Sequence, residues 1–103
     1  MRVAKLVNDT CLLFGSLGSD NLEKAKTLIC QALNLDPSTF ESRYSDYLGG
    51  WYYRHQSQSL SIYRNDGQYE KGIRIICQTE NIEQSQQILE YYEKNCVHGK
   101  PVI

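Results

Sequence analysis

The side chains most often used in catalysis are scarce in this 103-residue chain, and they form no familiar catalytic motif. The two histidines are His55 and His98, and neither has a partner at a recognisable spacing. General acid–base catalysis needs a positioned pair of titratable groups, and a cysteine nucleophile needs a base beside it. The signatures of serine hydrolases, P-loops, dinucleotide-binding folds and zinc proteases are also missing. The sequence therefore favours a protein without enzymatic activity, and a small enzyme using His55 with a cysteine remains an alternative.

The four cysteines also lack the spacing of a metal site. They contain no C-x-x-C pair, which is the pattern typical of structural zinc. Cys96-Val97-His98 offers only two ligands where a zinc ion takes three or four. We therefore expect no metal and no cofactor. We expect Cys11 and Cys77 to be buried, because a free cysteine packs as a small apolar side chain.

Composition narrows the class of protein further. Eleven basic against 12 acidic residues leave a net charge of −1, so no basic field is present to attract nucleic acid. No apolar run reaches the ~18–20 residues of a membrane helix. The N-terminal run carries Arg2 and Lys5, unlike a secretory signal. We expect a single folded domain over residues 1–103, in the cytoplasm and away from membranes.

Periodicity predicts three helices and five strands. Helical spacing of apolar residues and capping signals indicate the helices; for the last helix the cap is Asn81, with Gln84 three residues later, or Thr79. Aromatic and β-branched runs indicate the strands. The expected helices are Asn21–Asn34, Pro37–Leu48 and Ile82–Lys94. The expected strands are Arg2–Val7, Thr10–Gly15, Trp51–Gln56, Ser59–Asn65 and Ile73–Thr79, with Val102-Ile103 as a further edge strand if the tail pairs. The first two could instead form one irregular strand.

The second helix depends on three signals. Asp36 suits the N-cap and Pro37 the first helical position. Phe40, Tyr44 and Tyr47 recur at helical spacing, with Tyr44 and Tyr47 at the apolar margin, and a pair of glycines follows Leu48. The outward side of this helix would then carry Glu41 and Asp46, and it is one candidate binding surface.

These elements predict an α+β domain: a mostly antiparallel sheet of about four or five strands with about three helices packed on one face. Strand alternation divides the side chains between two faces. One face is apolar enough to be the core and comprises Trp51, Tyr53, Leu60, Ile62, Ile73, Ile75 and Cys77. The other face is at least partly open and comprises Tyr52, Arg54, Ser61, Tyr63, Arg74, Ile76 and Gln78.

The open face interleaves tyrosine with arginine, two residue types enriched at protein–protein interfaces. Tyr52, Arg54, Tyr63 and Arg74 are therefore candidate partner-binding residues. Stacking of single-stranded RNA on the tyrosines is the alternative. The low net charge counts against it, because phosphate contact needs basic residues. The plainest interpretation is an ordinary solvated sheet face, or one covered by the tail or by a second copy of the chain.

The layout over about Asp20–Tyr53 resembles the central section of barstar-type ribonuclease inhibitors, small immunity proteins that block a toxin. The resemblance consists of the first helix, Leu35-Asp36-Pro37, the second helix, and Gly49-Gly50-Trp51 leading into a strand. It implies that the second helix and its preceding loop enter the partner's site. By position, the implied residues here are Asp36, Glu41, Tyr44 and Asp46. The chain departs from this type after Trp51, where three strands follow in succession.

The sequence thus leads to one functional hypothesis. We expect a non-enzymatic, cytoplasmic immunity protein, similar to those of contact-dependent growth inhibition in bacteria. Its partner would be a cognate protein toxin, with a nuclease as one candidate. A sheet-based RNA-binding or regulatory module is the alternative.

Overall fold

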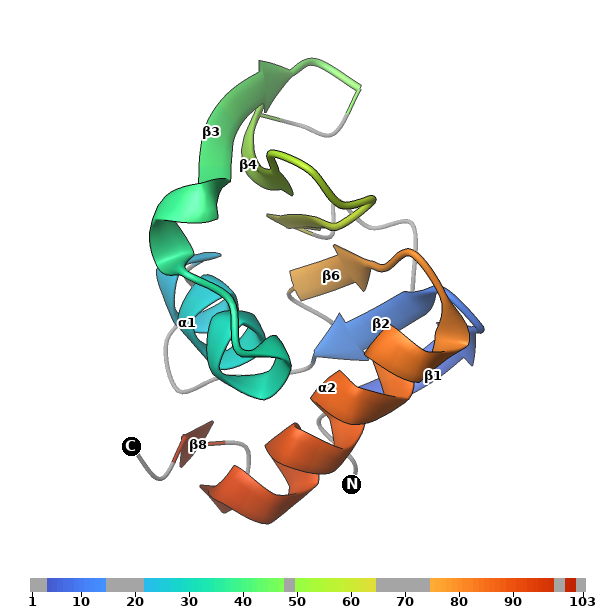
Figure 1. Ribbon diagram of the computed structural model, residues 1–103. Helices are drawn as coiled ribbons and strands as arrows, with labels where there is room; N and C mark the ends of the chain where they lie inside the picture. The colour runs from blue at the N-terminus through green and yellow to red at the C-terminus, as the bar shows by residue number, and fades with distance from the viewer. Residues whose placement is uncertain (1–3, 15–21, 48–49, 65–74, 98–99, 102–103) are drawn as a thin grey trace.

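The computed structural model describes residues 4–14, 22–47, 50–64, 75–97 and 100–101. Two α-helices in these ranges lie together on one face of a six-stranded antiparallel sheet (Figure 1). The strands follow the order β1-β2-β6-β5-β4-β3 across the sheet. They are β1 (Ala4–Asn8), β2 (Cys11–Phe14), β3 (Phe40–Ser45), β4 (Gly50–His55), β5 (Ser61–Arg64) and β6 (Ile75–Gln78). The helices are α1 (Leu22–Leu33) and α2 (Ile82–Asn95).

This architecture confirms an α+β domain with an antiparallel sheet and its helices on one face. The number of elements differs from the prediction, because the main sheet has six strands and the described residues hold two α-helices rather than three. A separate two-stranded ribbon pairs β7 (Cys96–Val97) with β8 (Lys100–Pro101). The predicted edge strand Val102-Ile103 lies outside the described residues.

The core lies between the helices and one face of the sheet. Leu12, Ile62 and Cys77 occupy one row across β2, β5 and β6, and all three are fully buried. The ring of Phe14 meets that of Tyr92 at a centroid distance of 5.4 Å, so α2 packs directly on β2. Burial of such side chains supplies most of the stabilisation of a small domain. The predicted burial of Cys11 and Cys77 is confirmed.

Local signals define several of the boundaries. The side chain of Asn8 accepts a hydrogen bond from the Thr10 N–H at 2.9 Å, which closes the β1–β2 turn. Asn34 has φ +56° just after α1, and the Leu35 N–H bonds to the Cys30 carbonyl, a common helix ending. Asn81 accepts from the Gln84 N–H at 3.0 Å and caps α2 as predicted.

The predicted helix over Pro37–Leu48 is wrong. Asp36 does cap a helical turn, accepting from the Ser38 N–H at 2.9 Å, but this is a single 3-10 turn, η1 (Pro37–Thr39). The next six residues form β3. They alternate between the two faces of the sheet, and each pairs with a residue of β4. Pairing with an aromatic strand outweighs an accidental helical spacing of apolar residues.

The predicted core face is confirmed except at Trp51. One of its predicted members, Ile73, lies outside the described residues. Trp51 is on the helix side of β4, as its alternation with Tyr53 requires, but it is 61 % exposed. In Figure 1 the β3–β4 hairpin extends beyond the helices, so its far end has no helix to cover it. Tyr44, predicted at an apolar margin, is exposed there for the same reason, and Tyr47, predicted at the same margin, is exposed in the β3–β4 turn.

Candidate partner-binding surface

The distal face, defined here as the sheet face turned away from α1 and α2, gathers polar and aromatic side chains from three adjacent strands. Alternation places Tyr52 and Arg54 of β4 on this face, as predicted. The register sets Arg43 opposite Tyr52 and Glu41 opposite Arg54. Tyr63 joins them from β5. The surface therefore combines aromatic rings, guanidinium groups and one carboxylate.

Glu41 and Arg43 form an ion pair along β3. The Glu41 Oε2 atom lies 2.8 Å from Arg43 Nη2 and 3.2 Å from Arg43 Nε. This contact raises the pKa of the Arg43 guanidinium. Both side chains are about half exposed, so the pair adds little to stability. The Arg43 guanidinium also interacts with the neighbouring Tyr52.

Tyr63 is more firmly held than the other aromatic residues of the distal face. Its ring packs against Cys11 and Ile76, which form a small buried cluster on this side of the sheet. Its hydroxyl accepts a hydrogen bond from Gln78 Nε2 at 3.1 Å. Partial burial raises the pKa of the Tyr63 hydroxyl. On the distal face, the Cys11 and Ile76 side chains of β2 and β6 are thus buried, whereas those of β3 and β4 are more exposed.

A second group of aromatic side chains lies on the helix side of the β3–β4 hairpin. The rings of Tyr44 and Trp51 meet edge to face at a centroid distance of 5.7 Å, and they are 60 % and 61 % exposed. Tyr47, in the connecting turn, is 80 % exposed. The exposed Tyr44–Trp51 pair is of a kind that is unusual on a solvated surface and typical of contact sites.

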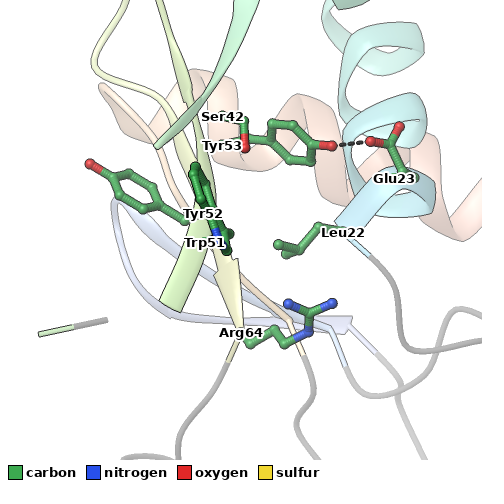
Figure 2. Close-up of a pocket in the computed structure, with 7 residues that line it drawn as sticks. All are labelled: Leu22, Glu23, Ser42, Trp51, Tyr52, Tyr53 and Arg64. Atoms are coloured by element: carbon green, nitrogen blue, oxygen red, sulfur yellow. Dashed lines mark hydrogen bonds between the residues drawn. The ribbon is translucent and has the colours of Figure 1, made fainter. Parts of the chain in front are cut away.

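A hollow of about 210 Å³ opens below Trp51, between β4 and the start of α1 (Figure 2). In Figure 2 the Tyr52 ring points away from the hollow, whereas Tyr53 reaches Glu23. The lining residues are Leu22, Glu23, Ser42, Trp51, Tyr52, Tyr53 and Arg64.

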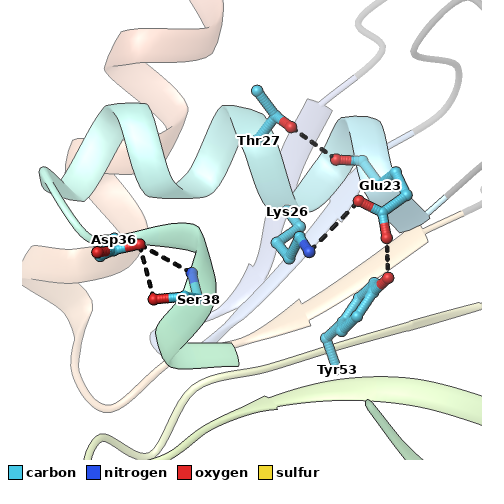
Figure 3. A network of polar contacts seen from close by, with 6 residues as sticks. All are labelled: Glu23, Lys26, Thr27, Asp36, Ser38 and Tyr53. Carbon is cyan, nitrogen blue, oxygen red and sulfur yellow. Dashed lines mark hydrogen bonds and ion pairs between the residues drawn. The ribbon is translucent and has the colours of Figure 1, made fainter. Parts of the chain in front are cut away.

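Both oxygens of the Glu23 carboxylate are occupied (Figure 3). One accepts a hydrogen bond from the Tyr53 hydroxyl, and the other lies 3.3 Å from Lys26 Nζ. The bond from Tyr53 and the charge of Lys26 lower the pKa of the Glu23 carboxyl, whereas partial burial opposes them. Glu23 is therefore held as a charged, structurally engaged carboxylate.

His55 is similarly engaged. It is buried, and its Nδ1 atom accepts from the backbone N–H groups of Ser57 and Gln58, each at 3.1 Å. The Nε2 atom is buried with no hydrogen-bond partner among the described residues. The His55 ring meets Phe40 edge to face at 5.2 Å. The ring thus organises the turn after β4.

The predicted site residues divide into three groups. Glu41, Tyr52, Arg54 and Tyr63 come together on the distal face. Asp36, Tyr44 and Asp46 lie apart from them, at the η1 cap, on the helix side of β3 and in the β3–β4 turn. Arg74 lies outside the described residues. The acidic helix that the barstar-type layout implies is not formed, because Glu41 belongs to a strand.

Sequence reasoning missed Arg43 and Trp51. The period-two pattern Phe40, Ser42, Tyr44 against Glu41, Arg43, Ser45 is the signal that could have placed Arg43 on the distal face. No comparable signal marked Trp51, because its exposure depends on where α1 begins relative to the hairpin.

Comparisons with models of protein families, with curated proteins and with solved structures found no match to this chain. Within the described ranges, no group of three or more histidine, cysteine or acidic side chains is placed to hold a metal ion. No helix in those ranges is long and apolar enough to cross a membrane.

Proposed function

We propose that this chain is a non-enzymatic protein-binding module whose contact surface is the distal face over β3, β4 and β5. The observation that carries the proposal is the grouping of Tyr52 and Tyr63 with Arg43 and Arg54 on adjacent strands. Tyrosine and arginine provide large, rigid, amphipathic contact area, and they recur as anchors of interfaces. Regular strands support these side chains, so little conformational freedom is lost on binding.

The partner we propose is a cognate bacterial toxin, which the chain would neutralise as a cytoplasmic immunity protein. The distal group contains two guanidinium groups against one carboxylate, Glu41, so it suits a partner surface that carries carboxylates. Asp36, Glu41 and Asp46 lie on three separate segments. The proposal therefore depends on the distal face rather than on an acidic helix inserted in a nuclease site.

Expression with the neighbouring reading frame tests this function. Cells that express the neighbouring gene alone should lose viability, and cells that also express this chain should recover. The purified pair should elute as one complex. A Tyr52→Ala chain that folds normally should lose the protection, whereas a Lys24→Ala chain, altered on the exposed side of α1, should keep it. The proposal fails if no neighbouring product is bound or neutralised.

A sheet-based RNA-binding module is the second candidate, favoured by the same interleaving of tyrosine and arginine. It predicts retention of single-stranded RNA in a filter-binding assay, with a steep loss as salt rises. Arg54→Ala combined with Arg74→Ala should abolish retention. Absence of binding at low salt would dismiss this candidate.

A further inference from the structure

β3 forms one edge of the six-stranded sheet. It pairs continuously with β4 over Phe40–Ser45, and it contains no proline and no bulge. The opposite edge, β1, differs because its register shifts between Leu6 and Asn8. Bulges and prolines are common means by which proteins prevent edge strands from pairing with other chains. Among the described strands, β3 is therefore the edge that lacks this protection.

The hydrogen bonds around β3 show which of its backbone groups point away from the sheet. The Thr39 carbonyl accepts from the Gln56 N–H at 3.0 Å, so the odd-numbered residues bond towards β4. The Phe40 N–H instead bonds to the Pro37 carbonyl. Alternation then directs the backbone N–H and carbonyl of Ser42 and Tyr44, and the carbonyl of Phe40, outwards.

We propose that two copies of this chain associate through β3, in an antiparallel pairing whose two-fold axis passes through Ser42. Ser42 would exchange both of its backbone hydrogen bonds with Ser42 of the partner subunit. The Tyr44 N–H would bond to the carbonyl of the partner subunit's Phe40. By symmetry, the N–H of the partner subunit's Tyr44 would bond to the Phe40 carbonyl. The two sheets would then form one continuous sheet.

Charge complementarity selects this register. It places Glu41 opposite the partner subunit's Arg43, and Arg43 opposite the partner subunit's Glu41. Opposite charges therefore alternate along the seam, which is the line where the two β3 strands meet. Sliding one strand by two residues would instead set Glu41 against its own copy, or Arg43 against its own copy. Like charges directly opposite each other destabilise a strand pair, whereas opposite charges stabilise it. Both neighbouring registers are therefore disfavoured.

The helix side of the seam adds apolar contact. In the proposed register Tyr44 lies opposite the partner subunit's Phe40, and Tyr44 already packs against Trp51. Tyr44 and Trp51 are both more than half exposed in the single chain. Pairing would cover part of these rings, and aromatic pairs across strands stabilise sheets. The seam is thus charged on the distal side and aromatic on the helix side.

Sedimentation equilibrium of the full chain at increasing concentration tests the proposal. The expected result is a reversible shift from a species of 11.9 kDa to one of twice that mass. Glu41→Arg alone or Arg43→Glu alone should each weaken dimerisation by about tenfold or more, because two attractive pairs become repulsive. The double variant Glu41→Arg, Arg43→Glu should restore it, because the register then pairs opposite charges again.

Two further variants separate the seam from general effects of charge or folding. Ser42→Pro removes an N–H that points away from β4, so the sheet should persist and the dimer should be lost. Glu90→Lys changes an exposed charge on α2 and should leave dimerisation unchanged. Circular dichroism checks folding in each case. A chain that stays at 11.9 kDa at every concentration overturns the proposal, as does a dimer that survives both Ser42→Pro and the single charge reversals. Neither result depends on the proposed toxin partner.

Discussion

Tyr53 donates its phenolic hydroxyl to the carboxylate of Glu23, and this hydrogen bond joins β4 to the first turn of α1 (Figure 3). Lys26 completes the arrangement, with its ammonium group 4.5 Å from the centre of the Tyr53 ring and 3.3 Å from the Glu23 carboxylate. The contact spans 30 residues of sequence. It therefore links a strand that carries the distal face to the helical layer, in addition to the shared core.

Tyr53→Phe should lower the free energy of unfolding by about 1 kcal/mol, because it removes one partly exposed hydrogen bond to a charged group and keeps the ring. Urea denaturation followed by circular dichroism measures the change. Glu23→Gln should cost a similar amount, and the double variant should cost less than the sum of the two. Additive effects would show that the two residues do not act through a shared contact.

The same contact predicts a loss of stability at alkaline pH. The hydrogen bond to Glu23 raises the pKa of Tyr53 to about 12, from an ordinary value of 10.0. Since the pKa of Tyr53 is raised in the folded state, the stabilisation from its hydrogen bond to Glu23 is complete below pH 10. This stabilisation disappears as the pH rises towards 12. Urea midpoints for the native chain and for Tyr53→Phe should therefore converge over that interval. A constant difference between them at all pH values would contradict this explanation.

Removing the His55 ring should destabilise the domain more than removing the Tyr53 hydroxyl. His55→Ala should lower the free energy of unfolding by about 2–4 kcal/mol, because it removes buried ring contacts and the acceptor for two backbone N–H groups. His55→Asn can return an acceptor near the position of Nδ1, and so it should lose less than His55→Gln, whose amide extends further. Thermal or urea denaturation ranks the three variants. If asparagine and glutamine were equally destabilising, the two hydrogen bonds to Nδ1 would not be what His55 provides.

The sequence was sufficient to predict elements whose signals are local. α1 and α2 have apolar stripes at helical spacing, and Asn8 and Asn81 supply turn and cap chemistry from their own side chains. The alternation that sends Tyr52 and Arg54 to the distal face is equally local. These predictions were right because each depends on neighbours within a few residues.

The features that the sequence did not predict depend on how one element packs or pairs with another. Residues 40–45 carry both a helical and a period-two pattern, and pairing with β4 decides between them. Trp51 is exposed because α1 does not cover the end of the hairpin, which a strand's own sequence cannot reveal. The same pairing brings Glu41 beside Arg54 on the distal face, whereas the sequence placed Glu41 on the outward side of a helix.

The buried cysteines predict resistance to thiol reagents. Cys11, Cys30 and Cys77 are buried and form no disulfide, and burial raises the pKa of Cys30 and of Cys77. The thiolate is the reactive form, so these side chains should react only when the domain opens. In a Cys96→Ser variant, Ellman's reagent should modify no thiol of the folded protein on the timescale on which all three react in denaturant. Rapid modification of a folded sample would indicate that one of these cysteines is accessible.

Substitutions on the distal face test which residues bind the proposed partner. Tyr52→Ala should weaken binding by more than about 2 kcal/mol if the ring is an anchor, and Arg54→Ala should have a similar effect. Tyr63 packs on Cys11 and Ile76, so Tyr63→Phe, which keeps the ring, is the informative change there. It should reduce affinity modestly, because the hydroxyl already accepts a bond from Gln78.

Matched changes elsewhere decide between the distal face and the other candidate residues. Asp46 is also a candidate contact residue, so Asp46→Ala, which should cost more than about 2 kcal/mol of binding if Asp46 is an anchor, measures the contribution of the β3–β4 turn. Asp36→Ala tests the η1 cap, and its effect must be corrected for lost stability, since Asp36 bonds to Ser38. Titration calorimetry with the purified partner gives each affinity. If Asp46→Ala and Asp36→Ala weaken binding while Tyr52→Ala does not, the partner contacts the turn and cap, and the distal face is not the binding surface.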